Sequence, residues 1–174
     1  MITLTGTPTL TTERLYLRAP EARDTAAYMR FYQGPRSCYV GGPKDQRAAW
    51  DMWTSQFGHW VIHGFGMFVV TRREDPAPLG IVGHWFPETR PEKEVGWVLF
   101  DDVSEGQGIA SEAARACIDH AWTTLGWDHM VSYIDTGNDR SVALAKRLGA
   151  TLDRTAPQLA KPCLVYRHQK GGLS

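Results

Sequence analysis

Two glycines spaced Gly-x-Gly, Gly106 and Gly108, lie between an apolar run over residues 95–100 and an alanine-rich segment with helical periodicity. This order predicts a tight turn at the N-terminus of a helix, where several backbone N–H groups have no partner within the helix. The helix dipole adds positive potential at that point, and phosphate is the anion most often bound there. We therefore expect a phosphate-bearing ligand whose charge is held by the main-chain amides of this loop.

Composition limits the classes of protein that could carry this loop. The 174 residues fit a single domain with its own core, and contents of 43% hydrophobic and 22% charged residues are ordinary for a globular protein. The formal net charge of zero gives no uniformly basic surface, so we expect no nucleic-acid partner. Cys38, Cys117 and Cys163 lack CxxC spacing, which argues against a disulfide framework and a structural metal. The N-terminus has no basic region followed by a long apolar stretch, so we expect a cytoplasmic protein without a membrane span.

Hydrophobic periodicity and turn residues predict the elements that position the loop. We expect strands over residues 10–18, 66–71, 79–86, 94–100 and 129–134, helices over 21–31, 43–60 and 138–148 and directly after the glycine loop, and weaker strands near Thr151 and over 163–167. Pro43 suits the first turn of its helix, and Gly126 and Gly149 suit the ends of the two later helices. The order predicts one α+β domain with a mixed sheet, residues 1–174 with a core of about 8–168.

Three separated segments resemble those of a known family. They are Thr-Glu-Arg-Leu-Tyr-Leu-Arg at 12–18, Glu-Val-Gly-Trp-Val-Leu at 94–99 followed by Gly-Gln-Gly-Ile-Ala-Ser-Glu-Ala at 106–113, and Asn-Asp-Arg-Ser at 138–141 followed by Leu-Gly-Ala at 148–150. Together they resemble the Gcn5-related N-acetyltransferases (GNAT), closest to the subgroup that includes the RimJ and RimL ribosomal-protein acetyltransferases. A lone Gly-x-Gly would be weak evidence, whereas three segments in register are strong evidence for the family and weak evidence for the substrate.

The resemblance implies a GNAT fold, with a twisted, mostly antiparallel central sheet, helices on both faces and a V-shaped splay between the fourth and fifth strands. It implies that acetyl-CoA binds in this splay, with the pantetheine arm along the open strand edge and the pyrophosphate on the glycine loop. The residues expected to contact the cofactor are Val98, Leu99, Phe100, Gly106, Gln107, Gly108, Ile109, Ala110, Ser111, Asn138 and Ser141. A homodimer is common among relatives.

Two positions depart from the family's pattern. The motif Gln/Arg-x-x-Gly-x-Gly/Ala begins here with Glu105, whose carboxylate would repel a pyrophosphate. Many relatives place a tyrosine near the start of the last helix as general acid; this chain has Leu144 and Ala145 there, so Ser141 is the available hydroxyl. Asn138 and Ser141 also suit the N-cap and N3 positions of that helix, a role that need not exclude contact with the cofactor.

Acetyl transfer to an amine requires a neutral amine, a polarised thioester carbonyl and a stabilised leaving thiolate. Glu94 is the expected base, directly or through water, because it opens the strand beside the expected thioester; the structural alternative is a solvent-facing residue in an ion pair. His84 on the neighbouring strand is a second candidate base, although a lone histidine beside Trp85 is more often a packed residue. The backbone N–H of Val98 is the expected donor to the carbonyl.

The resemblance places the acceptor amine in a groove walled by the first two helices and the middle strands. Tyr32, Trp53, His84 and Trp85 are the expected substrate-binding residues, although at least half of the aromatic candidates in this region are expected in the core. A protein N-terminus, a polyamine and a small antibiotic-like amine all stay open as acceptors.

The sequence therefore predicts an acetyl-CoA-dependent N-acetyltransferase that transfers the acetyl group directly in a ternary complex. One alternative is a non-catalytic acyl-CoA-binding or regulatory module on the same fold, which Glu105 and the missing tyrosine would suit. Another is a dinucleotide-binding protein, but Ser111 replaces the third glycine of that fingerprint and antiparallel strands are expected before the motif.

Overall fold

The computed structural model describes residue 4 and residues 6–171. Part of the segment on which the targeting expectation depends, residues 1–3 and 5, lies outside this description, as do residues 172–174. Within the described residues, no helix combines the length and the apolar character needed to cross a membrane. In the same part of the chain, no group of three or more His, Cys, Asp or Glu side chains is placed to hold a metal ion.

The elements follow the expected order with small shifts of boundary. The strands are β1 Leu10–Thr11, β2 Leu15–Arg18, β3 Met67–Arg72, β4 Gly80–Trp85, β5 Glu94–Leu99, β6 His129–Ile134, β7 Thr151–Leu152 and β8 Leu164–Gln169. The α-helices are α1 Thr25–Gln33, α2 Gln46–His63, α3 Ile109–Thr123 and α4 Asp139–Arg147, and the short 3₁₀ helices are η1 Ala22–Asp24, η2 Pro35–Val40 and η3 Asp102–Ser104.

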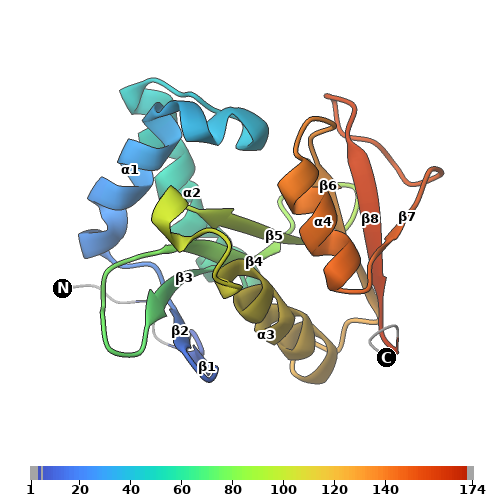
Figure 1. The fold of residues 1–174 in the computed structure, drawn as a ribbon, viewed down its shortest axis with the longest axis horizontal. Helices are drawn as coiled ribbons and strands as arrows, with labels where there is room; N and C mark the ends of the chain where they lie inside the picture. The colour runs from blue at the N-terminus through green and yellow to red at the C-terminus, as the bar shows by residue number, and fades with distance from the viewer. Residues whose placement is uncertain (1–3, 5, 172–174) are drawn as a thin grey trace.

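Over the residues that the structure describes, one sheet of eight strands runs in the order β1-β2-β3-β4-β5-β6-β8-β7. Every neighbouring pair is antiparallel except β5 and β6, which are parallel. Figure 1 shows α1 and α2 on one side of the sheet, α3 on the other, and α4 with the last strands forming the right-hand part of the molecule. The mixed, mostly antiparallel α+β fold with helices on both faces is therefore confirmed.

Successive side chains along the central strands point to opposite faces of the sheet and form two separate hydrophobic layers. Phe68, Val70 and Val82 point to the α3 face, where the alanines and Cys117 of that helix pack closely. Their neighbours Met67, Val69 and Ile81 point to the aromatic side chains of α1 and α2. Each fully buried aliphatic or aromatic side chain contributes about 1.5–3 kcal/mol, so these layers hold the sheet firmly on both sides.

Local hydrogen bonds explain where the boundaries differ from the expected ones. The expected first strand is divided, because Thr12 and Leu15 close a turn with two hydrogen bonds of 3.0 Å. Helix α2 begins after Asp45, whose side chain accepts the Ala48 N–H at 2.7 Å, so Pro43 precedes the helix instead of opening it.

The glycines at the ends of the later helices behave differently from one another. Gly149 directly follows Leu148, the C-cap of α4, with a positive φ of 81°, as expected for a residue that stops a helix. Gly126 does not cap α3: the C-cap is Thr124, and Gly126 lies in the turn that follows, with a φ of 69°.

Candidate functional site

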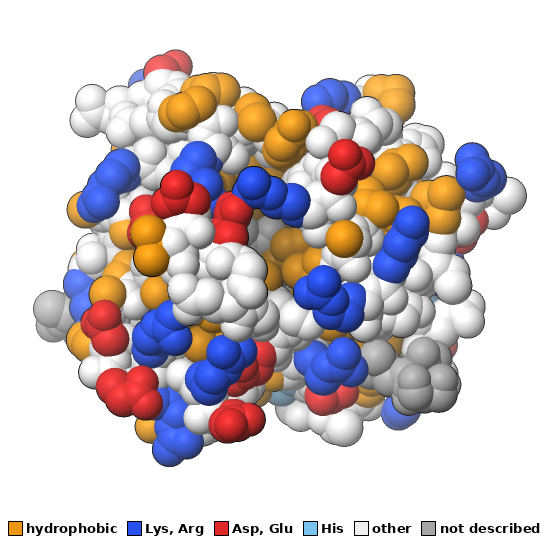
Figure 2. All heavy atoms as spheres, in the orientation of Figure 1, with side chains coloured by type: hydrophobic (Ala, Val, Ile, Leu, Met, Phe, Trp, Pro, Cys, Tyr) orange, Lys and Arg blue, Asp and Glu red, His pale blue; other side chains and the backbone are white. Residues whose placement is uncertain are grey.

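A cleft of about 1000 Å³ opens where β5 and β6 diverge. Its walls come from the end of β5, the glycine loop with the first turn of α3, one side of α4, and η2. Figure 2 shows a hollow near the centre of this face, with hydrophobic side chains inside it and charged side chains around its rim. The fold thus brings together segments that lie far apart in the sequence.

The divergence begins immediately after the first residue of β5. Among the described residues, the register between β5 and β6 holds the single pair Glu94↔Val131, whereas β4 and β5 are paired along six positions. The Val131 N–H donates to Lys93 O at 2.9 Å, just before the strands separate. Beyond this point, the edge of β5 that faces β6 is open to an extended ligand arm.

A buried side-chain pair replaces the missing backbone pairing at the point of divergence. The Ser132 hydroxyl donates to Val95 O at 2.7 Å, and His168 Nε2 lies 3.1 Å from the same hydroxyl oxygen. Burial lowers the pKa of His168 to about 4, so its ring is neutral. Because Ser132 gives its one hydroxyl hydrogen to Val95 O, the His168 Nε2–H is the donor to Ser132. A side chain that takes the place of a strand hydrogen bond thus sets where β5 and β6 part.

We expect Ser132→Ala to destabilise the fold by about 1–3 kcal/mol, because it leaves the buried Val95 carbonyl without its donor. The free energy of unfolding in urea measures this effect. Ser55→Ala is the matched control, since the Ser55 hydroxyl also donates to a carbonyl, Met52 O at 2.7 Å, but on an exposed helix surface. Ser55→Ala should lower the free energy of unfolding by no more than about 0.5 kcal/mol. Equal losses of unfolding free energy in the two variants would contradict the assigned role of Ser132.

The glycine loop has the backbone conformation that its sequence requires. Gly106 and Gly108 have φ values of 72° and 77°, in the left-handed region that other residues enter at a cost. Gly108 is the N-cap of α3, and among the described residues no side chain caps this end of the helix. The first N–H groups of α3 therefore remain available to an anion in the cleft.

Most of the expected cofactor residues line this cleft. Those that do are Val98, Leu99, Gly106, Gly108, Ile109, Ala110, Ser111, Asn138 and Ser141. Phe100 instead packs into the α1–α2 layer against Tyr28 and Phe31. Gln107 is outside the lining too, because its side chain bonds Arg72 and Val103 O at the loop's outer surface.

Hydrogen bonds join the start of α4 both to its own backbone and to a side chain of β5. Asn138 Oδ1 accepts the Ser141 N–H at 3.1 Å, which is the N-cap bond expected for this pair. The Ser141 hydroxyl oxygen in turn accepts the indole N–H of Trp97 at 3.2 Å. Capping and cleft lining are thus combined in the same two residues, and the bond from the indole does not use the hydroxyl hydrogen of Ser141.

Glu94 is buried, with 9% of its surface exposed, and is not a solvent-facing residue. Burial raises the pKa of its carboxyl to about 7, while the guanidinium of Arg90, 3.2 Å from Oε2, acts in the opposite direction. A carboxyl with such a pKa changes its charge near neutral pH, which is the property of an effective general base.

Three side chains surround Glu94 on the α1–α2 face of the sheet. Trp85 is its direct partner in the β4–β5 register and is half-buried. The Arg90 guanidinium lies 5.3 Å from the centre of the Tyr133 ring, as well as beside Glu94. Within the described part of the chain, the Tyr133 hydroxyl is buried without a hydrogen-bond partner, and burial raises its pKa to about 12. Arg90 and Tyr133 were not among the residues expected from the sequence.

The other residues expected to bind the acceptor amine belong to the core. His84 has no exposed surface and bonds Cys117 O through Nε2 at 2.9 Å, on the α3 face and so on the opposite side of the sheet from Glu94. Burial lowers its pKa to about 4. Trp53 donates its indole N–H to Thr25 Oγ1 at 3.0 Å and joins α2 to α1. Tyr32 is buried beneath the same aromatic layer, where burial raises its pKa to about 12.

The structure also adds residues to the cleft that the sequence did not indicate. They come from η2 and from the cleft-facing side of α4, and the main ones are Arg36, Tyr39, Arg140, Ala143 and Arg147. The spacing of two arginines and an alanine in α4 was a usable signal, because positions 140, 143 and 147 share one side of a helix. No comparable signal marked the η2 segment.

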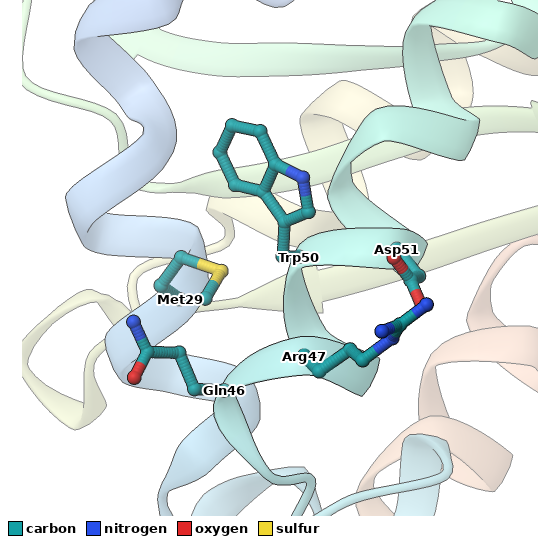
Figure 3. Close-up of a pocket in the computed structure, with 5 residues that line it drawn as sticks. All are labelled: Met29, Gln46, Arg47, Trp50 and Asp51. Atoms are coloured by element: carbon teal, nitrogen blue, oxygen red, sulfur yellow. The ribbon is translucent and has the colours of Figure 1, made fainter.

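A second hollow of about 580 Å³ lies on the outer surface of α1 and α2 (Figure 3). Met29, Gln46, Arg47, Trp50 and Asp51 line it, and none of these residues belongs to the expected site. Half-exposed Trp50 supplies its apolar part, and Arg47 and Asp51 lie 3.7 Å apart on successive turns of α2. It is separate from the cleft at the splay.

An open strand edge, a glycine loop at a helix N-terminus and a capped second helix define an acyltransferase of the GNAT type. Residues 14–151 match the acetyltransferase (GNAT) domain family, so the chain belongs to this family. Membership indicates an acyltransferase that uses an acyl-CoA. The resemblance noted in the sequence is confirmed.

Individual relatives agree with this assignment. The acetyltransferase from Agrobacterium tumefaciens str. C58 is 40% identical, with a TM-score of 0.89 over 94% of this chain and 95% of that one. YkkB of Bacillus subtilis (strain 168), itself uncharacterized, is 29% identical over 92% of this chain and 95% of its own. An acetyltransferase from Salmonella typhimurium, described as modifying the N-terminal serine of ribosomal protein L7/L12, matches at 17% identity with a TM-score of 0.75 over 94% and 99% of the two chains. At that identity, the likeness to the RimL type is one of fold.

Proposed function

We propose that this protein is an acetyl-CoA-dependent N-acetyltransferase, organised as one acetyltransferase domain over residues 1–174, that transfers an acetyl group directly to a primary amine. The observation that carries the proposal is the cleft at the splay, which joins the open edge of β5, the uncapped start of α3 and the Asn138–Ser141 cap. Its volume of about 1000 Å³ suits an extended, phosphate-bearing ligand.

The residues present fit coenzyme A at each of its parts. Trp97 and Leu99 offer main-chain groups to the amides of the pantetheine arm, in the manner of an added strand, because they share with Val95 the side of β5 that faces β6. Gly106 and Gly108 allow the pyrophosphate to approach the backbone closely, and the amides of Ile109 to Ser111 meet its charge. The bound cofactor supplies an activated acetyl group as a thioester.

Glu94 is the proposed general base. It accepts a proton from the incoming ammonium group, directly or through one water, and so provides the neutral amine. Its buried carboxyl, with a pKa of about 7, is half ionised near neutral pH, so it both accepts and releases the proton readily.

The main-chain groups of Val98 face Ile81 on β4, because Phe100 N–H donates to Leu79 O and alternate residues of a strand face the same neighbour. The N–H of Trp97, on the open edge, therefore replaces the expected Val98 N–H as the proposed donor that polarises the thioester carbonyl.

Ser141 is the proposed group that stabilises the departing sulfur. Its hydroxyl oxygen already accepts the Trp97 indole N–H, so the hydroxyl hydrogen remains available to the cleft. Because a thiolate is a good leaving group, one hydrogen bond from a serine suffices in place of the tyrosine found in many relatives.

The proposed acceptor is a protein N-terminus or a small-molecule primary amine. Trp85, Arg90 and Tyr133 are placed to contact it, because they surround Glu94 on the face of the sheet opposite α3. Tyr32 and Trp53 are proposed to support this wall from beneath. The structural similarity to the Salmonella typhimurium enzyme, which modifies an N-terminal serine, favours testing peptide N-termini first.

The second candidate function is a non-catalytic acyl-CoA-binding module, which is favoured by the lack of a tyrosine in α4, Asp139–Arg147. A turnover assay separates the two: the protein is incubated with acetyl-CoA and a library of peptide and small-molecule amines, and free thiol and acetylated products are measured. Thiol release matched by an acetylated amine supports the proposed function. Binding of acetyl-CoA without any acetylated product across the library would favour the binding module.

A further inference from the structure

Three charged side chains meet at the rim of the cleft. Arg36 Nη2 lies 2.6 Å from Glu105 Oε1, and Arg140 Nη1 forms an ion pair with Glu105 Oε2. All three residues line the cleft, and Figure 2 shows basic and acidic side chains side by side at its rim. Glu105, which the sequence places beside the phosphate loop as a source of repulsion, therefore has its charge matched by two guanidinium groups.

The three residues come from opposite walls of the cleft. Arg36 belongs to η2 and also donates from Nε to Phe100 O at 3.3 Å, Glu105 precedes Gly106, and Arg140 lies in the first turn of α4. One carboxylate between two guanidinium groups leaves a net charge of +1 at the entrance to the glycine loop. An anion that enters the loop meets this charge directly.

We propose that Arg36 and Arg140 bind the phosphate groups of coenzyme A, and that Glu105 is a positioning residue which holds both guanidinium groups at the rim until the phosphates replace it. The inference rests on the proposed function, since it assumes that a coenzyme A thioester enters the cleft. Glu105 then competes with the phosphates for the same two side chains and lowers the affinity for the cofactor.

Exposure and chemistry both favour this exchange. The Arg140 side chain is 80% exposed, against 35% for Arg36 and 29% for Glu105, so Arg140 is the partner that moves with least loss of packing. Ion pairs between exposed side chains are weak, whereas a phosphate offers a guanidinium group stronger, bidentate hydrogen bonds. When the cofactor binds, both guanidinium groups therefore bind its phosphates in preference to the Glu105 carboxylate.

The test measures dissociation constants for coenzyme A by calorimetry at one fixed ionic strength. We expect Glu105→Gln to tighten binding by about tenfold, because it removes the competing charge. Arg140→Gln should weaken binding, and by more in the Glu105→Gln background than in the wild-type background, because only there is the arginine free from its carboxylate. Asp102→Asn is the matched control: it removes the same charge from an exposed position three residues before Glu105 and should change the constant by less than about twofold.

Fragments of the cofactor identify the group that replaces Glu105. Dephospho-coenzyme A keeps the pyrophosphate, and pantetheine has no phosphate. A gain from Glu105→Gln that persists for dephospho-coenzyme A assigns the arginines to the pyrophosphate, and a gain seen for the complete coenzyme A alone assigns them to the 3′-phosphate. In both cases the gain should be absent for pantetheine. A similar gain for pantetheine would overturn the proposal, because the effect would then not depend on phosphate.

Weaker or unchanged coenzyme A binding by a folded Glu105→Gln protein would also overturn it, since Glu105 would then support the site or play no part in it. Unfolding in urea without ligand checks the fold of each variant. If the wild-type protein binds coenzyme A and acetylates amines while Glu105→Gln gives no gain, this inference alone fails. If the wild-type protein binds no coenzyme A, the proposed function fails with it.

Discussion

A Gly108→Asp variant should lose coenzyme A binding while retaining its fold. Gly108 is the N-cap of α3 and lines the cleft, so an aspartate there puts a carboxylate where the pyrophosphate is proposed to bind. Two unit charges about 4 Å apart repel by about 4 kcal/mol at an effective dielectric constant of about 20, which corresponds to a loss of roughly three orders of magnitude in affinity. Calorimetric titration with coenzyme A measures it.

Two variants separate this charge effect from backbone strain. Gly108→Asn places a side chain of the same shape, without the charge, at the same φ of 77°, and should lose much less affinity. Gly126→Asp introduces the same charge at a φ of 69° in the turn after α3, and in neither position would a new Cβ meet a neighbour closer than 3.4 Å. Strain of about 1–2 kcal/mol is expected in each variant. Normal affinity in a folded Gly108→Asp protein would remove the pyrophosphate from this loop.

A Glu94→Gln variant should lose about 10²–10⁴-fold in kcat while its affinity for coenzyme A changes little. The amide cannot accept the proton of the amine, and Glu94 does not belong to the residues that line the cofactor cleft. A base acts when deprotonated, so with the carboxyl pKa raised to about 7 the wild-type rate should rise with pH and level off above about 7. The variant should lack this ascending limb of the pH–rate profile.

Glu92→Gln is the matched control for the base. Glu92 is two residues away and pairs with Arg167 at 2.7 Å, and Arg167 keeps Asp153 as a second partner at 2.8 Å when Glu92 is replaced. This variant should keep both the rate and the ascending limb. If Glu94→Gln retains the wild-type pH–rate profile, the base must be sought elsewhere.

Much of the fold could be predicted because its elements differ in period and are separated by glycines and prolines. The three central strands appear within a residue of their expected bounds and α3 begins directly after the glycine loop as expected, since alternation and small-residue spacing are strong local signals. The segment Pro35–Val40 was missed, because a glycine followed by a proline is typical of a break between elements, whereas Pro35 opens a short 3₁₀ helix. Pro43 was misplaced because the capping oxygen of Asp45, not the proline ring, sets the start of α2.

The candidate site, too, could be predicted from the sequence only in part. Glycines and helix caps could be located from the sequence, because their role depends on their own backbone and near neighbours. Side-chain direction could not, as His84 and Phe100 show: one points to the α3 face and the other into the α1–α2 layer. The pairing of Glu105 with Arg36 and Arg140 joins positions 69 and 35 residues apart, so only the folded chain reveals it.

The splay also bears on how this sheet avoids aggregation. A strand that stops pairing in the middle of a sheet has free amide and carbonyl groups, which elsewhere recruit strands from other molecules. Here that edge lies within a cleft walled by η2 and α4 and rimmed by charged side chains. A single thin, extended chain fits such a groove, whereas a second β-sheet does not. The same enclosure that we propose admits the cofactor therefore protects the protein from forming edge-to-edge polymers.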